Sequence, residues 1–89
     1  MAPLNMIFKA LGDPTRMAII QLLRERSRTP SELLERIPVS QPTLSHHLDI
    51  LKRANLVETR RNGQFIVYSL NMTVVQMAME YFMKFHKRK

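Results

Sequence analysis

Residues 39–57, VSQPTLSHHLDILKRANLV, concentrate the side chains of this chain that could do chemistry. Ser45, His46, His47 and Asp49 follow one another closely in this stretch. These residue types form metal sites, nucleophilic active sites and hydrogen bonds to the base edges of DNA. Which of the three applies depends on how the local backbone places the side chains.

The apolar pattern of this stretch predicts a helix from Ser40 to about Arg53 or Ala54. Three leucines recur at i, i+4 and i+7 and form one buried stripe: Leu44, Leu48 and Leu51. Consecutive residues on a helix point about 100° apart, so His46 and His47 cannot bind one ion together. The same geometry prevents the adjacent serine and histidine from forming a nucleophile–base contact, which argues against catalysis.

The outward face of the predicted helix carries short or planar donors and acceptors near its N-terminus: Gln41, Thr43, Ser45 and His46. Such groups suit the major groove of DNA, and the N–H groups at the start of the helix suit a phosphate. The predicted recognition-helix contacts to DNA are therefore Ser40, Gln41, Thr43, Ser45 and His46. A face that is merely solvated would more typically carry Glu and Lys in i, i+4 pairs. We therefore interpret this face as a recognition surface, and we expect His47 to pack at the core edge with a ring nitrogen bonded to a neighbour.

Composition favours the same interpretation. The chain has 89 residues, of which 45% are apolar, enough for a single small domain spanning residues 1–89. Lys and Arg outnumber Asp and Glu by 14 to 7, and the pI is about 10.6. A basic balance of this kind indicates a nucleic-acid partner, with a ribosomal or membrane-surface role as the rival. The lack of cysteine excludes disulfides and thiolate sites, and an intracellular protein is the expectation.

Apolar and capping patterns predict the helices that position the recognition helix. A first helix around residues 4–11 ends at Gly12, and Asp13 with Pro14 should start a second helix with a broad apolar face. Residues 29–32, TPSE, form a capping box. That box should open a short third helix that reaches Ile37 and is ended by Pro38.

A hairpin and a final helix complete the predicted order. Residues 56–61 and 64–70 are expected to be strands around a tight Asn62-Gly63 turn, and the last helix should begin near Met72. A mainly helical chain with a helix-turn-helix followed by a small β-hairpin is a winged helix. Ordinary packing in an all-helical domain is the alternative, and the Asn-Gly hairpin disfavours it.

The predicted hairpin is basic near its turn. A wing of this kind reaches phosphates or the minor groove beside a recognition helix. Charge on a strand edge can also prevent pairing with another chain, and both roles can hold. The predicted wing and backbone contacts to DNA are Lys52, Arg53, Arg60, Arg61, Asn62 and Gly63.

Three segments resemble the ArsR-type winged-helix repressors of bacteria: FKALGDPTRMAIIQLL, SQPTLSHHLDILKRANLV and RRNGQFIVYSL. They occur in this order over nearly the whole chain, and the run GQFIVYSLNMTVVQ is most similar to the SdpR-like autorepressors. The resemblance implies a homodimer, formed by the first and last helices, that reads a palindromic operator. It also places the DNA contacts on the fourth helix and wing, at Gln41, Thr43, Ser45, His46, Arg60, Arg61 and Asn62.

The first and last helices contain more large apolar residues than a domain of this size can bury alone. Methionines beyond the main apolar stripes add to the excess: Met6, Met77, Met79 and Met83. They could fill the core of a single chain, but a two-fold dimer accounts for them better. The predicted interface residues are Leu4, Ile7, Phe8, Val75, Ala78, Met79 and Phe82.

Many relatives in this family sense metals, and here the chain departs from the pattern. One family site uses a Cys-x-Cys pair at the start of the third helix, where this chain has Thr29 and Ser31. Another uses acidic and histidine ligands on the last helix, where this chain aligns Met72, Val74, Phe85 and Arg88. His86 is a single ligand at best, and a fixed zinc or nickel site needs about four. We therefore predict no metal and no other cofactor.

These features together predict a cytoplasmic, nucleoid-associated and sequence-specific repressor, and not an enzyme. The SdpR-like resemblance implies that it represses its own operon and is released by a membrane-bound or other protein partner. The alternative hypothesis is a winged-helix module that binds protein through its basic face. Metal-dependent regulation through histidines shared between subunits ranks third.

Overall fold

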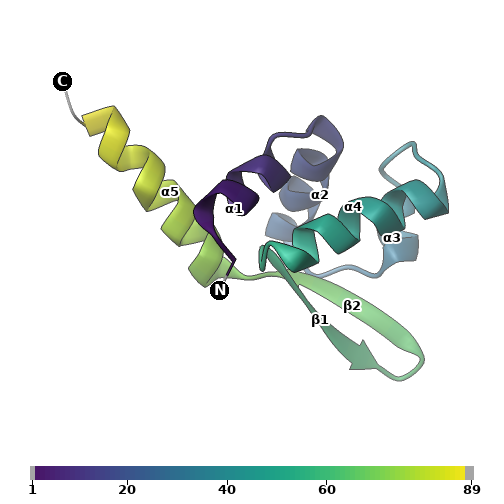
Figure 1. The fold of residues 1–89 in the computed structure, drawn as a ribbon. Coiled ribbons are helices and arrows are strands. Elements are labelled where there is room, and N and C mark those ends of the chain that lie inside the picture. The colour runs from purple at the N-terminus through teal and green to yellow at the C-terminus, as the bar shows by residue number, and fades with distance from the viewer. Residues whose placement is uncertain (1, 88–89) are drawn as a thin grey trace.

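The fold follows the predicted order of helices and strands. A computed structural model describes residues 2–87, and the side chains of residues 2–84. The elements are α1 (Leu4–Leu11), α2 (Pro14–Glu25), α3 (Pro30–Leu34), α4 (Gln41–Arg53), β1 (Val57–Asn62), β2 (Phe65–Leu70) and α5 (Met72–Lys87). In Figure 1, α1 to α4 form one body, from which the hairpin and α5 project in different directions. The mainly helical winged helix-turn-helix with one antiparallel hairpin is confirmed.

Side-chain caps start three of the helices where the sequence predicts them. The carboxylate of Asp13 accepts a hydrogen bond of 3.0 Å from the backbone N–H of Arg16. At α3, Thr29 and Glu32 cap each other reciprocally, as the capping box predicts. At α4, the Ser40 hydroxyl accepts a 3.3 Å hydrogen bond from the next turn. In each case a proline occupies the first turn, where a missing N–H has no effect on the helix.

The third helix is shorter than predicted. It ends at Leu34, and the chain continues as turns in which the N–H of Ile37 still bonds the Leu33 carbonyl at 3.0 Å. Pro38 explains this difference, because a residue that precedes proline is disfavoured in the helical region. Ile37 is nevertheless buried, so its predicted role in the core holds although its predicted place in the helix does not.

A tight link connects α4 to the hairpin. Asn55 has a φ of 61°, and its N–H bonds the carbonyl of Lys52 at 3.0 Å. The N–H of Leu56 bonds the carbonyl of Leu51, also at 3.0 Å. These two bonds form a Schellman motif, which ends a helix through one left-handed residue, for which asparagine is well suited. The motif fixes the direction in which the chain leaves α4 and enters β1.

The turn of the hairpin lies one residue later than predicted. Asn62 pairs with Phe65, so Gly63 and Gln64 form the turn instead of Asn62 and Gly63. Gly63 has a φ of +65°, which glycine adopts without a Cβ penalty. A two-residue turn with glycine at its first position has the backbone twist that matches paired strands. The hairpin therefore closes on the glycine, and Asn62 stays in the ladder.

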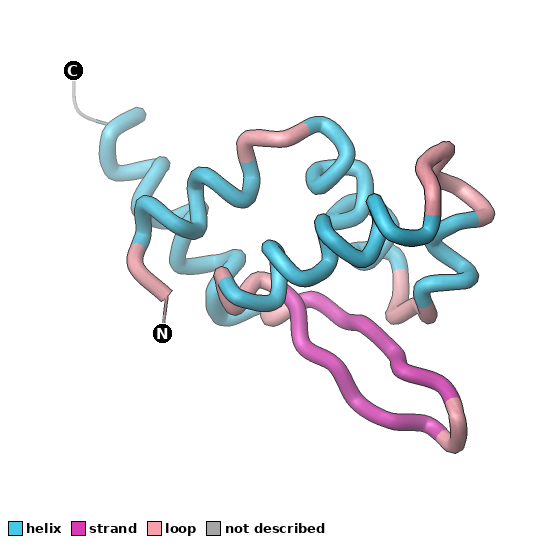
Figure 2. The backbone as a smooth tube through the Cα atoms, turned by 45° about the vertical axis from the view of Figure 1, so that its right-hand side comes forward, coloured by secondary structure: helices cyan, strands magenta, loops and turns pink. Residues whose placement is uncertain are grey.

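A short segment before α3 pairs with the hairpin and joins it to the helices. Arg28 and Tyr68 exchange backbone hydrogen bonds of 3.0 and 2.8 Å across the free side of β2. The buried guanidinium of Arg28 also donates to the Leu22 carbonyl at 3.1 Å and to Glu25 at 2.8 Å. Figure 2 shows the two strands projecting from the helical body. Their base is therefore anchored while their tip is exposed.

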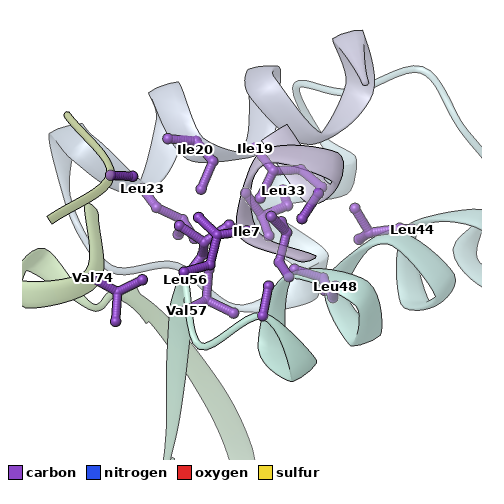
Figure 3. Packing of buried hydrophobic residues seen from close by; sticks show 14 of the residues in the cluster. Ile7, Ile19, Ile20, Leu23, Leu33, Leu44, Leu48, Leu56, Val57 and Val74 are labelled. Carbon is purple, nitrogen blue, oxygen red and sulfur yellow. The ribbon is translucent and has the colours of Figure 1, made fainter. Parts of the chain in front are cut away.

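The core lies between the helices and the start of β1. Its largest fully buried side chains come from four helices and the link after α4: Ile7, Ile19, Leu33, Leu44, Leu51 and Leu56. Figure 3 shows Ile7, Ile19, Leu33, Leu44 and Leu56 packed together with Leu48 of α4. Burying one leucine completely contributes about 1.5–3 kcal/mol. The predicted leucine stripe of α4 is therefore what fixes the helix to the body and turns its polar face outward.

The last helix is only partly packed against this core. Val74 and Ala78 are buried, whereas Met79 and Phe82 are 61% and 67% exposed. In Figure 1 the C-terminal part of α5 extends beyond the other helices. Within residues 2–87, no helix has both the length and the apolar character required to cross a membrane.

Candidate nucleic-acid interface

The polar face of α4 is exposed, as the sequence predicts. Gln41, Thr43, Ser45 and His46 are all exposed, whereas Leu44, Leu48 and Leu51 of the same helix are buried. The Ser40 hydroxyl donates to the Thr43 hydroxyl at 2.9 Å and accepts from the N–H of Thr43. Those two hydroxyls therefore take part in the helix cap. Gln41, Ser45 and His46 present their donors and acceptors outward.

His47 lies at the edge of the core, where the sequence predicts it. Its side chain is only 14% exposed, and its Nδ1 lies 3.2 Å from a guanidinium nitrogen of Arg16. Because arginine can only donate, Nδ1 is the acceptor and the proton of the neutral ring is on Nε2. The carboxylate of Asp13 lies 3.8 Å from the same Nδ1. The predicted bond between a ring nitrogen and a neighbouring group is confirmed.

Arg16 is a residue whose role the sequence patterns did not reveal. Its Nε donates to the Ala10 carbonyl at 2.7 Å, and Nη2 donates to the Lys9 carbonyl at 3.3 Å. Together with the contact to His47, these bonds connect α1, α2 and α4 through one side chain. A positive charge in the first turn of a helix is repelled by the positive end of the helix dipole. The position of Arg16, three residues after the cap, was therefore a signal that it had a partner elsewhere.

The end of α4 contains an ion pair that changes the interpretation of Arg53. Its Nε donates to Oδ2 of Asp49 at 2.9 Å, and its Nη2 donates to the same oxygen. Both side chains are exposed, at 70% and 51%. Lys52 is also exposed. Of the two predicted backbone contacts at this end of α4, Arg53 is thus already bonded to an acid on its own helix.

The two wing arginines lie on different faces of the hairpin. Arg60 and Arg61 are consecutive residues of β1, so their side chains alternate across the strand. Tyr68 pairs with the residue two places before Arg61 and therefore shares its face. Burial raises the pKa of the Tyr68 phenol, and the negative charge of Asp49 on α4 raises it further. Tyr68 also packs against the hydrophobic core of the helices, so Arg61 is on the hairpin face that is turned toward the helices, and Arg60 is on the opposite face.

The tip of the wing is exposed along its whole length. Arg60, Arg61, Asn62 and Gly63 all lie on the surface, as does Phe65 with 56% of its area exposed. Asn62 belongs to the last pair of the ladder rather than to the turn. The predicted wing residues are thus brought together at one end of the molecule, on an element that follows α4 directly.

Comparison with known proteins places this geometry in a family. A helix-turn-helix domain family matches residues 11–60, from the end of α1 into β1. The transcriptional repressor SdpR of Bacillus subtilis is 44% identical over 82 residues, which cover 92% of this chain and 91% of that protein. The arsenical resistance operon repressor of Staphylococcus xylosus is 46% identical over 68 residues, which cover 76% of this chain and 65% of that protein.

A solved structure has the same architecture. An ArsR-like transcriptional regulator from Rhodococcus sp. RHA1 matches with a TM-score of 0.84 at 29% identity, covering 93% of this chain and 78% of that chain. The chain belongs to the ArsR-type winged-helix repressor family. This is a family of transcriptional regulators and not of enzymes. In the winged helix-turn-helix of this ArsR-type chain, α3 and α4 are the helix pair and β1–β2 is the wing.

The predicted dimer residues of this ArsR-type chain fall into three groups. Ile7 and Ala78 are buried in the core of the single chain, so their apolar character is already accounted for. Leu4, Phe8 and Val75 are half-buried against that core. Met79 and Phe82 are exposed, and so are Met6 and Met83. The apolar residues that a partner could cover are therefore concentrated on α5.

The positions of the family's metal sites hold residues with other roles. Thr29 and Glu32 form the cap of α3, Met72 is exposed in the first turn of α5, and Val74 is in the core. Within the described part of the chain, no three His, Cys, Asp or Glu side chains cluster as metal ligands would. The side chains of Phe85 and His86, and the whole of Arg88, lie outside the described residues.

Proposed function

We propose that this protein is a sequence-specific transcriptional repressor that binds a palindromic operator as a homodimer, including the operator of its own gene. The observation that carries the proposal is the exposed polar face of α4 beside a basic wing. A helix with outward donors and acceptors fits the major groove, and a basic hairpin beside it fits the adjacent backbone or minor groove. The net charge of +7 adds a sequence-independent attraction to phosphates.

Base recognition and phosphate binding are divided between α4 and the wing. Gln41, Ser45 and His46 contact base edges, because they are the side chains of the α4 face that do not take part in its cap. Arg61 contacts the DNA backbone beside α4, since it is on the hairpin face that is turned toward the helices. Arg60, on the opposite face of the wing, binds phosphate or the minor groove.

The homodimer is proposed to form through α5 with support from α1. Met79 and Phe82 are large apolar side chains with most of their area exposed. A two-fold interface would cover the same patch on both subunits. It would also present two copies of α4 to half-sites spaced about one helical turn, roughly 34 Å, or a small multiple of it.

Regulation is proposed to involve a protein partner instead of a metal. The family's ligand positions contain Thr29, Ser31, Met72 and Val74, whose side chains lack the thiolate, imidazole and carboxylate donors of those sites. Release by a membrane-bound or other protein is what the SdpR-like resemblance implies for this chain. Binding to chromosomal DNA would make the protein nucleoid-associated in the cytoplasm.

The test separates base reading from phosphate binding. Footprinting of the tagged protein across the genome first identifies the operator, and a peak at its own promoter is expected. Titrations then compare the operator with a scrambled duplex at three salt concentrations. Gln41→Ala or His46→Ala should weaken operator binding by about 1–3 kcal/mol and leave the scrambled duplex nearly unchanged. Arg60→Ala and Arg61→Ala should weaken both duplexes and reduce the salt slope by about one for each phosphate per half-site that the variant no longer binds.

The same titration tests the metal and partner proposals. Stoichiometric zinc, nickel or cadmium should leave operator affinity unchanged, and a tenfold loss reversed by a chelator would overturn the metal-free proposal. If the α4 variants weakened both duplexes equally and the wing variants left the salt slope unchanged, the division of roles would be wrong. A wild-type protein without preference for any duplex would favour the alternative, a winged helix that docks on protein.

A further inference from the structure

An acidic residue lies in the middle of the face that should approach DNA. Asp49 is the acid of α4, one turn beyond Ser45 and one turn before Arg53. Its side chain is 51% exposed, and the rise of about 1.5 Å per residue places it about 6 Å beyond Ser45 along the helix. A carboxylate at this place repels every phosphate backbone that approaches α4, because charges are screened only over about 8–10 Å.

The hydrogen bonds of Asp49 leave one of its oxygens available. Both bonds from Arg53, through Nε at 2.9 Å and through Nη2, go to the same oxygen, Oδ2. An ionised carboxylate has acceptor sites on both oxygens. The bonds to Oδ2 restrain the carboxylate group, and Oδ1 can accept a hydrogen bond from outside the protein.

The ion pair between Asp49 and Arg53 should contribute little to the stability of the fold. Both partners are exposed on the surface, at 70% for Arg53 and 51% for Asp49. Pairs of this type at i, i+4 on a helix contribute little to folding. The pair does have two consequences for a DNA-binding face: it occupies a guanidinium that would otherwise be free to bind phosphates, and it orients the carboxylate.

We propose that Asp49 determines specificity by accepting a hydrogen bond through Oδ1 from the exocyclic amino group of a cytosine in the major groove. Carboxylates are the side chains that match this donor. On the operator the amino group compensates for the negative charge of Asp49. On random DNA no amino group is aligned with Oδ1 at most registers, so the carboxylate weakens binding and stays paired with Arg53. The inference rests on the proposed function and names a base contact that the recognition residues of α4 do not supply.

The proposal predicts opposite effects on two DNA duplexes. Asp49→Ala should weaken operator binding about 5- to 100-fold, the range expected for one base contact. The same variant should strengthen binding to a scrambled duplex severalfold, and it should steepen the salt slope by about one unit per protomer as Arg53 becomes free to bind phosphate. A change that only loosened α4 would weaken both duplexes, so the opposite signs distinguish a reading role from a structural one.

A matched control removes the same charge elsewhere. Glu35→Gln lies after α3, outside α4 and the wing, and is also exposed. It should change the affinities for the two duplexes by equal factors, because only the net charge differs. Arg53→Gln should weaken the scrambled duplex little and the operator more, since Asp49 then loses its orienting partner.

A set of operator variants identifies the base. Each base pair of one half-site is changed in turn, and binding by wild-type protein and by Asp49→Ala is compared. Wild-type protein should discriminate in favour of cytosine at one position, and the variant should bind all four bases there alike. If the wild type prefers its operator but Asp49→Ala shifts both duplexes in the same direction, the role of Asp49 is refuted while the proposed function stands. If the wild type has no preference, the proposed function itself fails.

Discussion

Arg16 offers the sharpest test of how the recognition helix is attached. The change Arg16→Ala removes donors to the Ala10 carbonyl at 2.7 Å, to His47 Nδ1 at 3.2 Å and to the Lys9 carbonyl at 3.3 Å. A hydrogen bond from a charged donor contributes about 1.5–3 kcal/mol when buried. The first two bonds are only part-buried, so we assign about 1–1.5 kcal/mol to each. The third is exposed and should contribute little.

The expected loss is therefore about 2–3 kcal/mol in the free energy of unfolding, a large part of the roughly 5–15 kcal/mol of a small domain. Urea unfolding at one protein concentration measures it as a lower midpoint with an unchanged m-value. Arg24→Ala is the matched control, because Arg24 is exposed on the same helix, and surface changes of this kind stay within about 0.5 kcal/mol.

Variants of His47 separate the hydrogen bond from packing. His47→Asn keeps an acceptor near the place of Nδ1, whereas His47→Leu keeps the volume and removes the acceptor. The asparagine variant should retain most of the stability, and the leucine variant should lose it together with operator binding. Equal midpoints for Arg16→Ala and Arg24→Ala would refute the argument, as would a leucine variant at least as stable as the asparagine variant.

Two further outcomes are expected from the remaining surfaces. Wild-type protein should sediment at about twice the 10.5 kDa chain mass. The double variant Met79→Ser, Phe82→Ser should sediment at the single-chain mass, whereas the control Gln76→Ser should remain a dimer. A wild-type protein that is monomeric at micromolar concentration would contradict the dimer. The N–H of Arg16 lowers the pKa of Asp13 below its ordinary 3.8, and the N–H of Thr29 lowers that of Glu32 below 4.5. Because both folded-state pKa values are depressed, their stabilisation is present above the ordinary values and is lost as pH falls through the lowered ones. Asp13→Asn should flatten the pH dependence of the urea midpoint between about pH 6 and pH 2, and an unchanged slope would show that the ionisation of Asp13 does not contribute.

Local chemistry made the helices of this fold predictable from the sequence. The caps at Asp13, Thr29 and Ser40 act within three residues, so a short stretch of sequence contains the whole interaction. The leucine stripe of α4 is also a local pattern, since burial of one face follows from helical periodicity. The end of α3 was misjudged because an apolar periodicity continues to Ile37 whether or not Pro38 allows the backbone to remain helical.

Long-range contacts of the candidate interface could not be predicted in the same way. Arg16 and His47 are 31 residues apart in the sequence, and their contact exists only after α1, α2 and α4 have packed. The apolar residues of α1 and α5 present the same difficulty. Periodicity marks Ile7 and Phe82 alike, but Ile7 is fully buried in its own chain and Phe82 is 67% exposed. A pattern of apolar residues does not show whether those residues pack within their own chain or against another subunit.

Helix α1 connects α5 to the recognition helix α4. On one side, the ring of Phe8 packs against Tyr81 of α5 with centroids 5.8 Å apart. On the other side, the last carbonyls of the same helix accept the hydrogen bonds of Arg16, which also binds His47 of α4. If α5 forms the dimer, α1 is the element through which its position is transmitted to the recognition helix. The distance between the two recognition helices, and hence the half-site spacing of the operator, then depends on how rigidly Arg16 joins α1 to α4.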